Sequence, residues 1–112
     1  MANLLIDDHA VTVSLSALEK AEALHGDVRV PRAAVVRARA VPDGMAEVHG
    51  LRMPGTGFPG VIMVGTWRTP HGSTFAICHG SGPAVVIDLQ GEPYDRIVLT
   101  AENPHEAVAR LS

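Results

Sequence analysis

The chain has 112 residues, of which 46% are hydrophobic and 19% charged, and its formal net charge is −3 at pH 7. This length predicts one domain over residues 1–112, and the apolar content is enough for a core, which excludes general disorder. The mild acidity gives no reason to expect nucleic-acid binding or strong membrane binding, and no apolar run approaches the roughly 20 residues of a membrane-spanning helix.

Cysteine usage and the start of the chain bear on its compartment. Cys78 is the one cysteine, so no intrachain disulfide requires an oxidising environment. The first residues contain neither a basic segment nor a long apolar segment of the kind found in signal peptides. We therefore expect a cytoplasmic protein. Eight of the nine basic residues are arginine, a bias that we interpret as the mark of a GC-rich bacterial genome.

The first predicted helix covers residues 16–25. Ser16 and Glu19 have the spacing of a capping box, in which each side chain accepts from a backbone N–H at the helix start. Ala17, Leu18, Ala21 and Leu24 are predicted to form its apolar face, and Gly26 is the predicted stop signal.

Extended segments dominate the rest of the chain. Alternating or continuous apolar runs predict about seven strands, at residues 10–15, 28–30, 35–41, 61–67, 73–79, 84–89 and 95–100. The connections at 69–72, 80–83 and 91–93 are short and rich in Gly and Pro. Short connections between consecutive strands predict an antiparallel meander, with 80–83 forming a hairpin turn.

A second helix is predicted directly after the last strand. Asn103 is a good N-cap, Pro104 suits the first helical position, and Glu106 stands at the third. Ala107, Val108 and Leu111 then give a short apolar stripe.

Segments 27–41, 50–60 and 98–106 together resemble parts of the bacterial pleckstrin-homology-like (PH-like) domains. They are similar to the second-strand region, to the glycine-rich connection into the second sheet and to the junction between last strand and helix. The resemblance implies a mainly β (α+β) fold, a partly open barrel of about seven antiparallel strands capped by the C-terminal helix. The extra helix near 16–25 departs from the simplest pattern, so the phosphoinositide binding of eukaryotic relatives is not carried over.

A glycine motif at residues 55–60 spells the G-x-G-x-x-G of dinucleotide-binding loops. That function needs a following helix and an acidic residue about 20 positions on. Here Pro59 interrupts the motif and a predicted strand follows. We interpret the segment as a tight loop between two sheets.

No cofactor or metal is predicted. The six histidines include no pair four residues apart, and Cys78 sits in an apolar strand, which is typical of a small buried side chain rather than a nucleophile. Trp67 could line a groove, but the core is the preferred interpretation.

The most promising polar group is basic. Arg29, Arg32, Arg37 and Arg39 crowd one segment of an acidic chain, and the guanidinium fork suits phosphate and carboxylate groups. They are the candidate anion- or partner-binding residues, the competing interpretation being a solvated face that protects a sheet edge.

The resemblance implies a non-catalytic binding or assembly module with a protein partner or self-association into an oligomer, and no shared catalytic residues. The alternative is a small ligand- or anion-binding protein or an enzyme, which would use scattered histidines, Cys78 and the Arg29–Arg39 segment.

Overall fold

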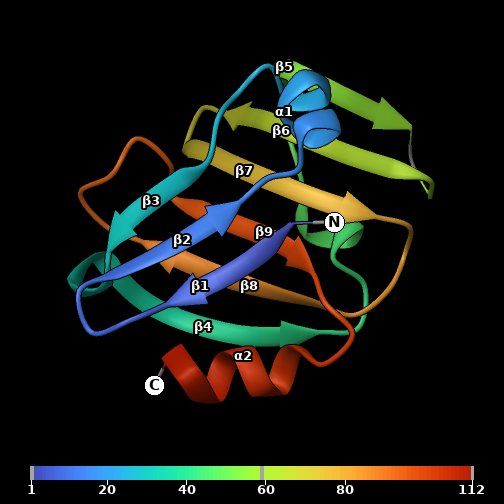
Figure 1. Ribbon diagram of the computed structural model, residues 1–112. Coiled ribbons are helices and arrows are strands. Elements are labelled where there is room, and N and C mark those ends of the chain that lie inside the picture. The colour runs from blue at the N-terminus through green and yellow to red at the C-terminus, as the bar shows by residue number, and fades with distance from the viewer. Residues whose placement is uncertain (1, 59, 112) are drawn as a thin grey trace.

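The computed structural model describes residues 2–58 and 60–111, which form two β-sheets and two α-helices (Figure 1). The strands are β1 (Asn3–Ile6), β2 (Ala10–Ser14), β3 (Val28–Pro31), β4 (Val35–Val41), β5 (Leu51–Phe58), β6 (Ile62–Thr69), β7 (Gly72–His79), β8 (Ala84–Leu89) and β9 (Arg96–Thr100). The helices are α1 (Ala17–Ala23) and α2 (Pro104–Leu111), and two short 3-10 turns are η1 (Arg32–Ala34) and η2 (Met45–Glu47). The predicted mainly β architecture is confirmed.

The order of the strands differs from the predicted meander. One sheet is antiparallel with the order β1-β2-β3, and the other has the order β4-β8-β9-β7-β6-β5. Strand β9 lies between β8 and β7 and runs parallel to β7, so residues 80–83 do not form the predicted hairpin. Backbone bonds from Gly44 N to Gly82 O and from Ala101 N to Pro83 O, each 3.0 Å, hold this connection instead.

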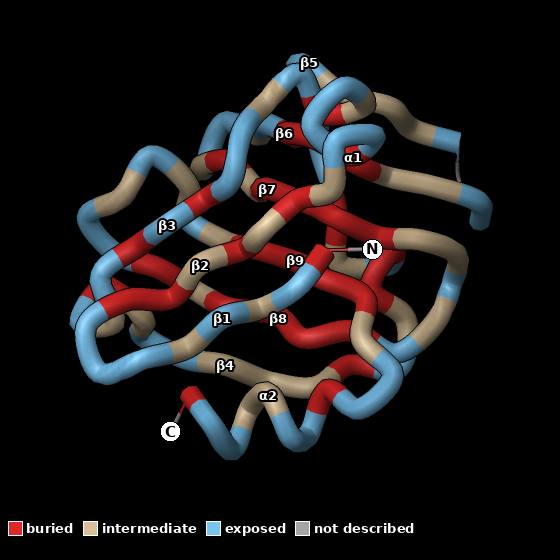
Figure 2. The backbone as a smooth tube through the Cα atoms, viewed as in Figure 1, coloured by how far each residue is buried: buried red, intermediate tan, exposed pale blue. Residues whose placement is uncertain are grey.

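The predicted barrel is also corrected, because the six-stranded sheet is not closed: β4 and β5 form its two edges. The three-stranded sheet covers one face of the larger one, α1 lies beside β5 and β6, and α2 runs along β4 (Figure 1). Figure 2 shows that burial is concentrated on the central strands β7, β8 and β9.

The main core lies between the two sheets. Its largest fully buried side chains are Phe75, Ile77, Ile87 and Ile97, and valines of β2, β6 and β8 join them. Leu111 closes the core from α2, with Ala107 and Val108 packed beside it. The predicted stripe of the second helix is therefore confirmed, as is its N-cap, since Glu106 N donates to Asn103 Oδ1 at 3.3 Å.

The glycine-rich segment is a strand and not the predicted loop. Gly55 and Gly65 lie opposite each other in β5 and β6, both with φ of +145°. A side chain on either would run into the backbone of its partner, so only this glycine pair lets the two strands approach so closely. The chain then continues from β5 into β6 with no helix, which removes the context that a dinucleotide loop needs. Pro59 of the motif lies outside the described residues.

Helix α1 has the predicted capping box, but the prediction of its buried face is wrong. Leu18 and Leu24 are 69% and 73% exposed, while Glu19 and Ala23 are 2% and 0% exposed. The helix ends at Ala23, with Leu24 in the left-handed conformation at φ 52°, so Gly26 is not the residue that stops it.

Candidate functional site

The outer face of the six-stranded sheet, turned away from the three-stranded sheet, is only half covered. Residues 42–48 cross one half, where Met45 and Val48 pack with Trp67, Val86 and Val98 into a second, smaller apolar cluster. A Cβ on Gly44 would lie 2.6 Å from Ala84 Cβ, so glycine lets this loop lie close on the sheet. The other half of the face carries polar side chains.

These polar side chains belong to one row that crosses all six strands and also includes Trp67 of the apolar cluster. Residues paired in register share a face of the sheet. The pairs Arg37–Asp88, Asp88–Arg96, Arg96–Thr74, Thr74–Trp67 and Trp67–Arg52 join β4, β8, β9, β7, β6 and β5 in sequence. We call Arg37, Asp88, Arg96, Thr74, Trp67 and Arg52 the cross-sheet row.

Asp88 is the charged centre of this row. Its Oδ1 accepts from Arg96 Nε at 2.8 Å, and its Oδ2 accepts from Arg37 Nη2 at 3.1 Å. Burial by itself raises the pKa of the Asp88 carboxyl, but the bonds and charges of Arg96 and Arg37 outweigh it and lower that pKa below its ordinary value of 3.8. One carboxylate thus orients two guanidinium groups.

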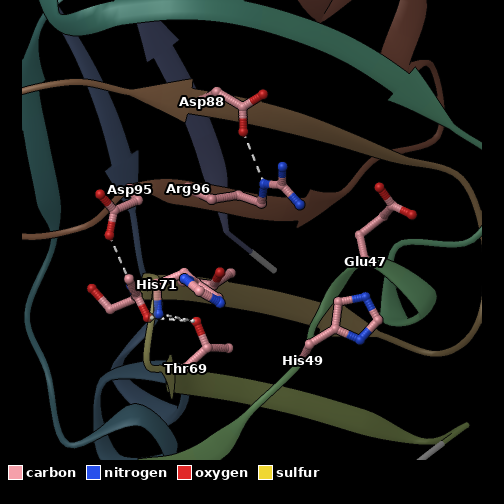
Figure 3. Close-up of a pocket in the computed structure, with 10 residues that line it drawn as sticks. Glu47, His49, Thr69, His71, Asp88, Asp95 and Arg96 are labelled. Atoms are coloured by element: carbon pink, nitrogen blue, oxygen red, sulfur yellow. Dashed lines mark hydrogen bonds and ion pairs between the residues drawn. The ribbon is translucent and has the colours of Figure 1, made fainter.

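A surface pocket of about 320 Å³ opens above the middle of the row. Its floor is formed by Thr74, Asp88 and Arg96, and its walls come from the residues around η2 and from the β6–β7 hairpin, with further lining residues Glu47, His49, Thr69, His71, Gly72, Ser73 and Asp95. Figure 3 shows Arg96, His49 and His71 around the open centre, with Glu47 rising from η2 at its edge. The pocket thus brings together residues of η2, β6, β7, β8 and β9.

The carboxylates of the pocket already have partners. Glu47 Oε1 pairs with Arg39 Nη2 at 2.7 Å, and Asp95 Oδ2 accepts from Ser73 N at 2.8 Å. Arg96 gives only its Nε to Asp88, and among the described residues no hydrogen bond engages its two terminal nitrogens. Those donors face the pocket (Figure 3).

The four predicted arginines are not brought together. Arg37 and Arg39 share a face of β4, where they pair with Asp88 and Glu47. Arg29 is exposed on β3 of the other sheet, and Arg32 in η1 donates to the backbone oxygens of Asp7 and Arg110 at 3.1 and 2.9 Å. That these residues bind an anion stays a prediction. Of the four, Arg37 and Arg39 lie next to the pocket, where each pairs with a carboxylate that lines it.

Sequence reasoning missed the pairing of Glu19 with His79. Glu19 Oε2 accepts from Ala2 N at 3.0 Å and lies 2.6 Å from His79 Nε2, while Oε1 accepts from Ser16 N at 2.8 Å. This carboxylate joins the start of the chain, α1 and β7. The capping box predicted the bond from Ser16 N. Nothing near Glu19 in the sequence indicates that its other oxygen meets a histidine 60 residues away.

Among the described residues, the other reactive side chains do not gather into a second site. Cys78 is 0% exposed, and burial raises the pKa of its thiol to about 12. The predicted buried role of Cys78 and the core position of Trp67, which is 5% exposed, are confirmed. Within residues 2–58 and 60–111, no three His, Cys, Asp or Glu side chains are grouped as metal ligands would be.

Comparison with known proteins gives no relative: no family model, no curated protein and no solved structure matches the chain. Neither helix in the described part of the chain is long and apolar enough to cross a membrane.

Proposed function

We propose that this chain is a non-catalytic binding module, and that it holds a protein segment on the outer face of its larger sheet. The observation that carries the proposal is the cross-sheet row, whose middle members Thr74, Asp88 and Arg96 form the floor of an open pocket. Sites that recognise ligands are concave and carry a few oriented polar groups, as this pocket does.

Two further features support the proposal. Strand β9 leads directly into α2, which packs on β4 and closes the main core, as the PH-like resemblance implies. The buried Cys78 with its raised pKa is a thiol and not a thiolate at neutral pH, which favours a binding role over nucleophilic catalysis.

Site-specific photo-crosslinking tests the proposal. A photoreactive residue at exposed His49 lies at the pocket, whereas the same residue at exposed Leu24 lies at the end of α1 and serves as the matched control. In lysate from cells that naturally make the chain, we expect a discrete protein adduct from position 49 and none from position 24. Equal labelling at both positions, or none at position 49, contradicts the proposal.

The same reagent separates a different protein from a second copy. Purified protein at high concentration gives a dimer-sized adduct from position 49 if the partner is another copy, and light scattering behind size-exclusion chromatography then shows a dimer. A monomer with no adduct assigns the face to a different protein.

A further inference from the structure

We propose that the pocket above the cross-sheet row binds a compact oxyanion, a carboxylate or phosphate group, between the free guanidinium nitrogens of Arg96 and the imidazoles of His49 and His71. This rests on the proposed function and deepens it, because it names the chemical group that the partner would present.

The first support is the orientation of Arg96. Its bond to Asp88 fixes the plane of the guanidinium group, so its terminal nitrogens point into the pocket without further ordering. A donor fork that is already held in place loses little side-chain entropy when a two-oxygen group docks on it. Thr74, on the floor beside Arg96, adds a hydroxyl that can donate to a third oxygen.

The second support is that positive and negative groups around the pocket are equal in number and that the negative ones already have partners. The charged groups in and beside the pocket are three arginines, Arg37, Arg39 and Arg96, and three carboxylates, Glu47, Asp88 and Asp95. Asp88 and Glu47 are held by arginines, and Asp95 accepts from a backbone N–H, so each carboxylate is turned toward a partner.

The third support is the pair of histidines on the rim. His49 and His71 are both exposed and come from separate elements, so each can turn a ring N–H toward a bound group. An imidazole always carries at least one ring N–H, so the two histidines add hydrogen-bond donors to those of Arg96 and Thr74.

Titration monitored by ¹H–¹⁵N correlation spectra tests this inference, first with inorganic phosphate. At pH 7 we expect saturable shifts centred on the amides of Thr74, Arg96, His49 and His71. Replacing His49→Ala together with His71→Ala is expected to weaken binding about tenfold or more, the scale of losing charge-assisted hydrogen bonds. His9→Ala with His105→Ala, two exposed histidines outside the pocket, is the matched control and should leave binding unchanged.

A rescue variant separates lost hydrogen-bond donors from lost structure. Replacing His49→Lys and His71→Lys keeps donors at both positions, so phosphate binding should persist. No phosphate binding, shifts spread over the whole surface, or shifts that survive the double alanine variant would overturn the inference.

A blocked hexaglutamate peptide and its hexaglutamine counterpart distinguish the source of the oxyanion. Tighter binding of hexaglutamate than of phosphate assigns the pocket to an acidic protein segment. Binding of phosphate alone assigns it to a free small oxyanion, which supports this inference and contradicts the proposed protein-binding function. If crosslinking at position 49 succeeds while no oxyanion binds, the proposed function stands and this inference fails.

Discussion

The two faces of the six-stranded sheet are built by the same strands and have opposite characters. On the inner face Phe75, Ile77, Ile87 and Ile97 are all buried against the second sheet. On the outer face the neighbouring positions Thr74, Asp88 and Arg96 form the floor of a pocket. Because successive side chains of a strand point to opposite faces, one strand can serve stability and recognition with adjacent residues. The inner face should control folding and the outer face binding.

The largest expected effect is on the inner face. Phe75→Ala removes a fully buried ring that packs on His25 and Tyr94, with ring centroids at 5.1 and 5.3 Å, and should lower the free energy of unfolding by about 3–5 kcal/mol. Its neighbour Thr74→Ala, on the outer face, should change it by less than about 1 kcal/mol. Urea denaturation of both variants measures the difference, and similar losses at the two positions would break the comparison.

The next effect concerns Glu19, which ties α1 to the end of β7. Glu19→Ala leaves the Ala2 and Ser16 amides without their acceptor and should cost about 2–3 kcal/mol. Glu19→Gln keeps one acceptor oxygen and replaces the other by a donating amide, so it should lose one of these bonds and cost less than Glu19→Ala. Urea denaturation at pH 7 ranks the two variants, and equal losses would show that the charge, not the hydrogen-bond geometry, matters.

The same carboxylate predicts a dependence of stability on pH. Burial raises the pKa of Glu19, but bonds from Ser16 and His79 outweigh it and hold that pKa below its ordinary value of 4.5. A lowered carboxylate pKa contributes stability that is fully present above the unfolded value and is lost as pH falls through the folded value. The difference in unfolding free energy between the native chain and Glu19→Gln should therefore shrink below about pH 4.5. A constant difference from pH 7 to pH 3 contradicts this.

What could be predicted from the sequence was local. The caps at Ser16 and Asn103 and the strands with regular apolar patterns were predicted because their signals lie within a few residues. The parallel pairing of β7 with β9 was not predicted, because the sequence of a short connection such as 80–83 does not show whether the two strands that it joins are paired. Which face of α1 is buried was decided by His79 and the start of the chain, far from the helix in sequence.

The candidate site shows the same division. Arg37 and Arg39 were selected for their charge, and both border the pocket through Asp88 and Glu47. Arg96 and Thr74 were not selected because the register of β7 with β9 pairs them, and His49 and His71 because the segment after η2 and the β6–β7 turn meet at the pocket only in the folded chain. The cluster of arginines in the sequence identified Arg37 and Arg39 at the edge of the pocket but not Arg96 at its centre.

A smaller effect separates the two roles within the outer face itself. Asp88→Asn removes the charge that Arg37 and Arg96 share and should lower the free energy of unfolding by about 1 kcal/mol, since both pairs are partly exposed. The asparagine amide keeps an oxygen that can accept from Arg96 Nε, so the substitution should also tighten phosphate binding, because the pocket gains one net positive charge. Asp8→Asn, at an exposed position, is the control that should change neither quantity. Denaturation with phosphate titration measures both; weaker phosphate binding in Asp88→Asn would mean that Arg96 must be held by a charged Asp88.

The smallest expected effect concerns two exposed leucines, one in α1 and one at its end. This helix covers the β5–β6 end of the inner face. Leu24 ends the helix at φ 52°, a conformation that costs a residue with a Cβ about 1 kcal/mol, so Leu24→Gly should stabilise the protein by up to that amount. Leu18 lies inside the helix, where glycine costs about 1 kcal/mol, so Leu18→Gly should have the opposite sign. Neither change removes much buried surface, because both side chains are mostly exposed. Thermal denaturation of the pair tests this: two changes of the same sign would mean that these leucines act through burial against a partner and not through backbone conformation.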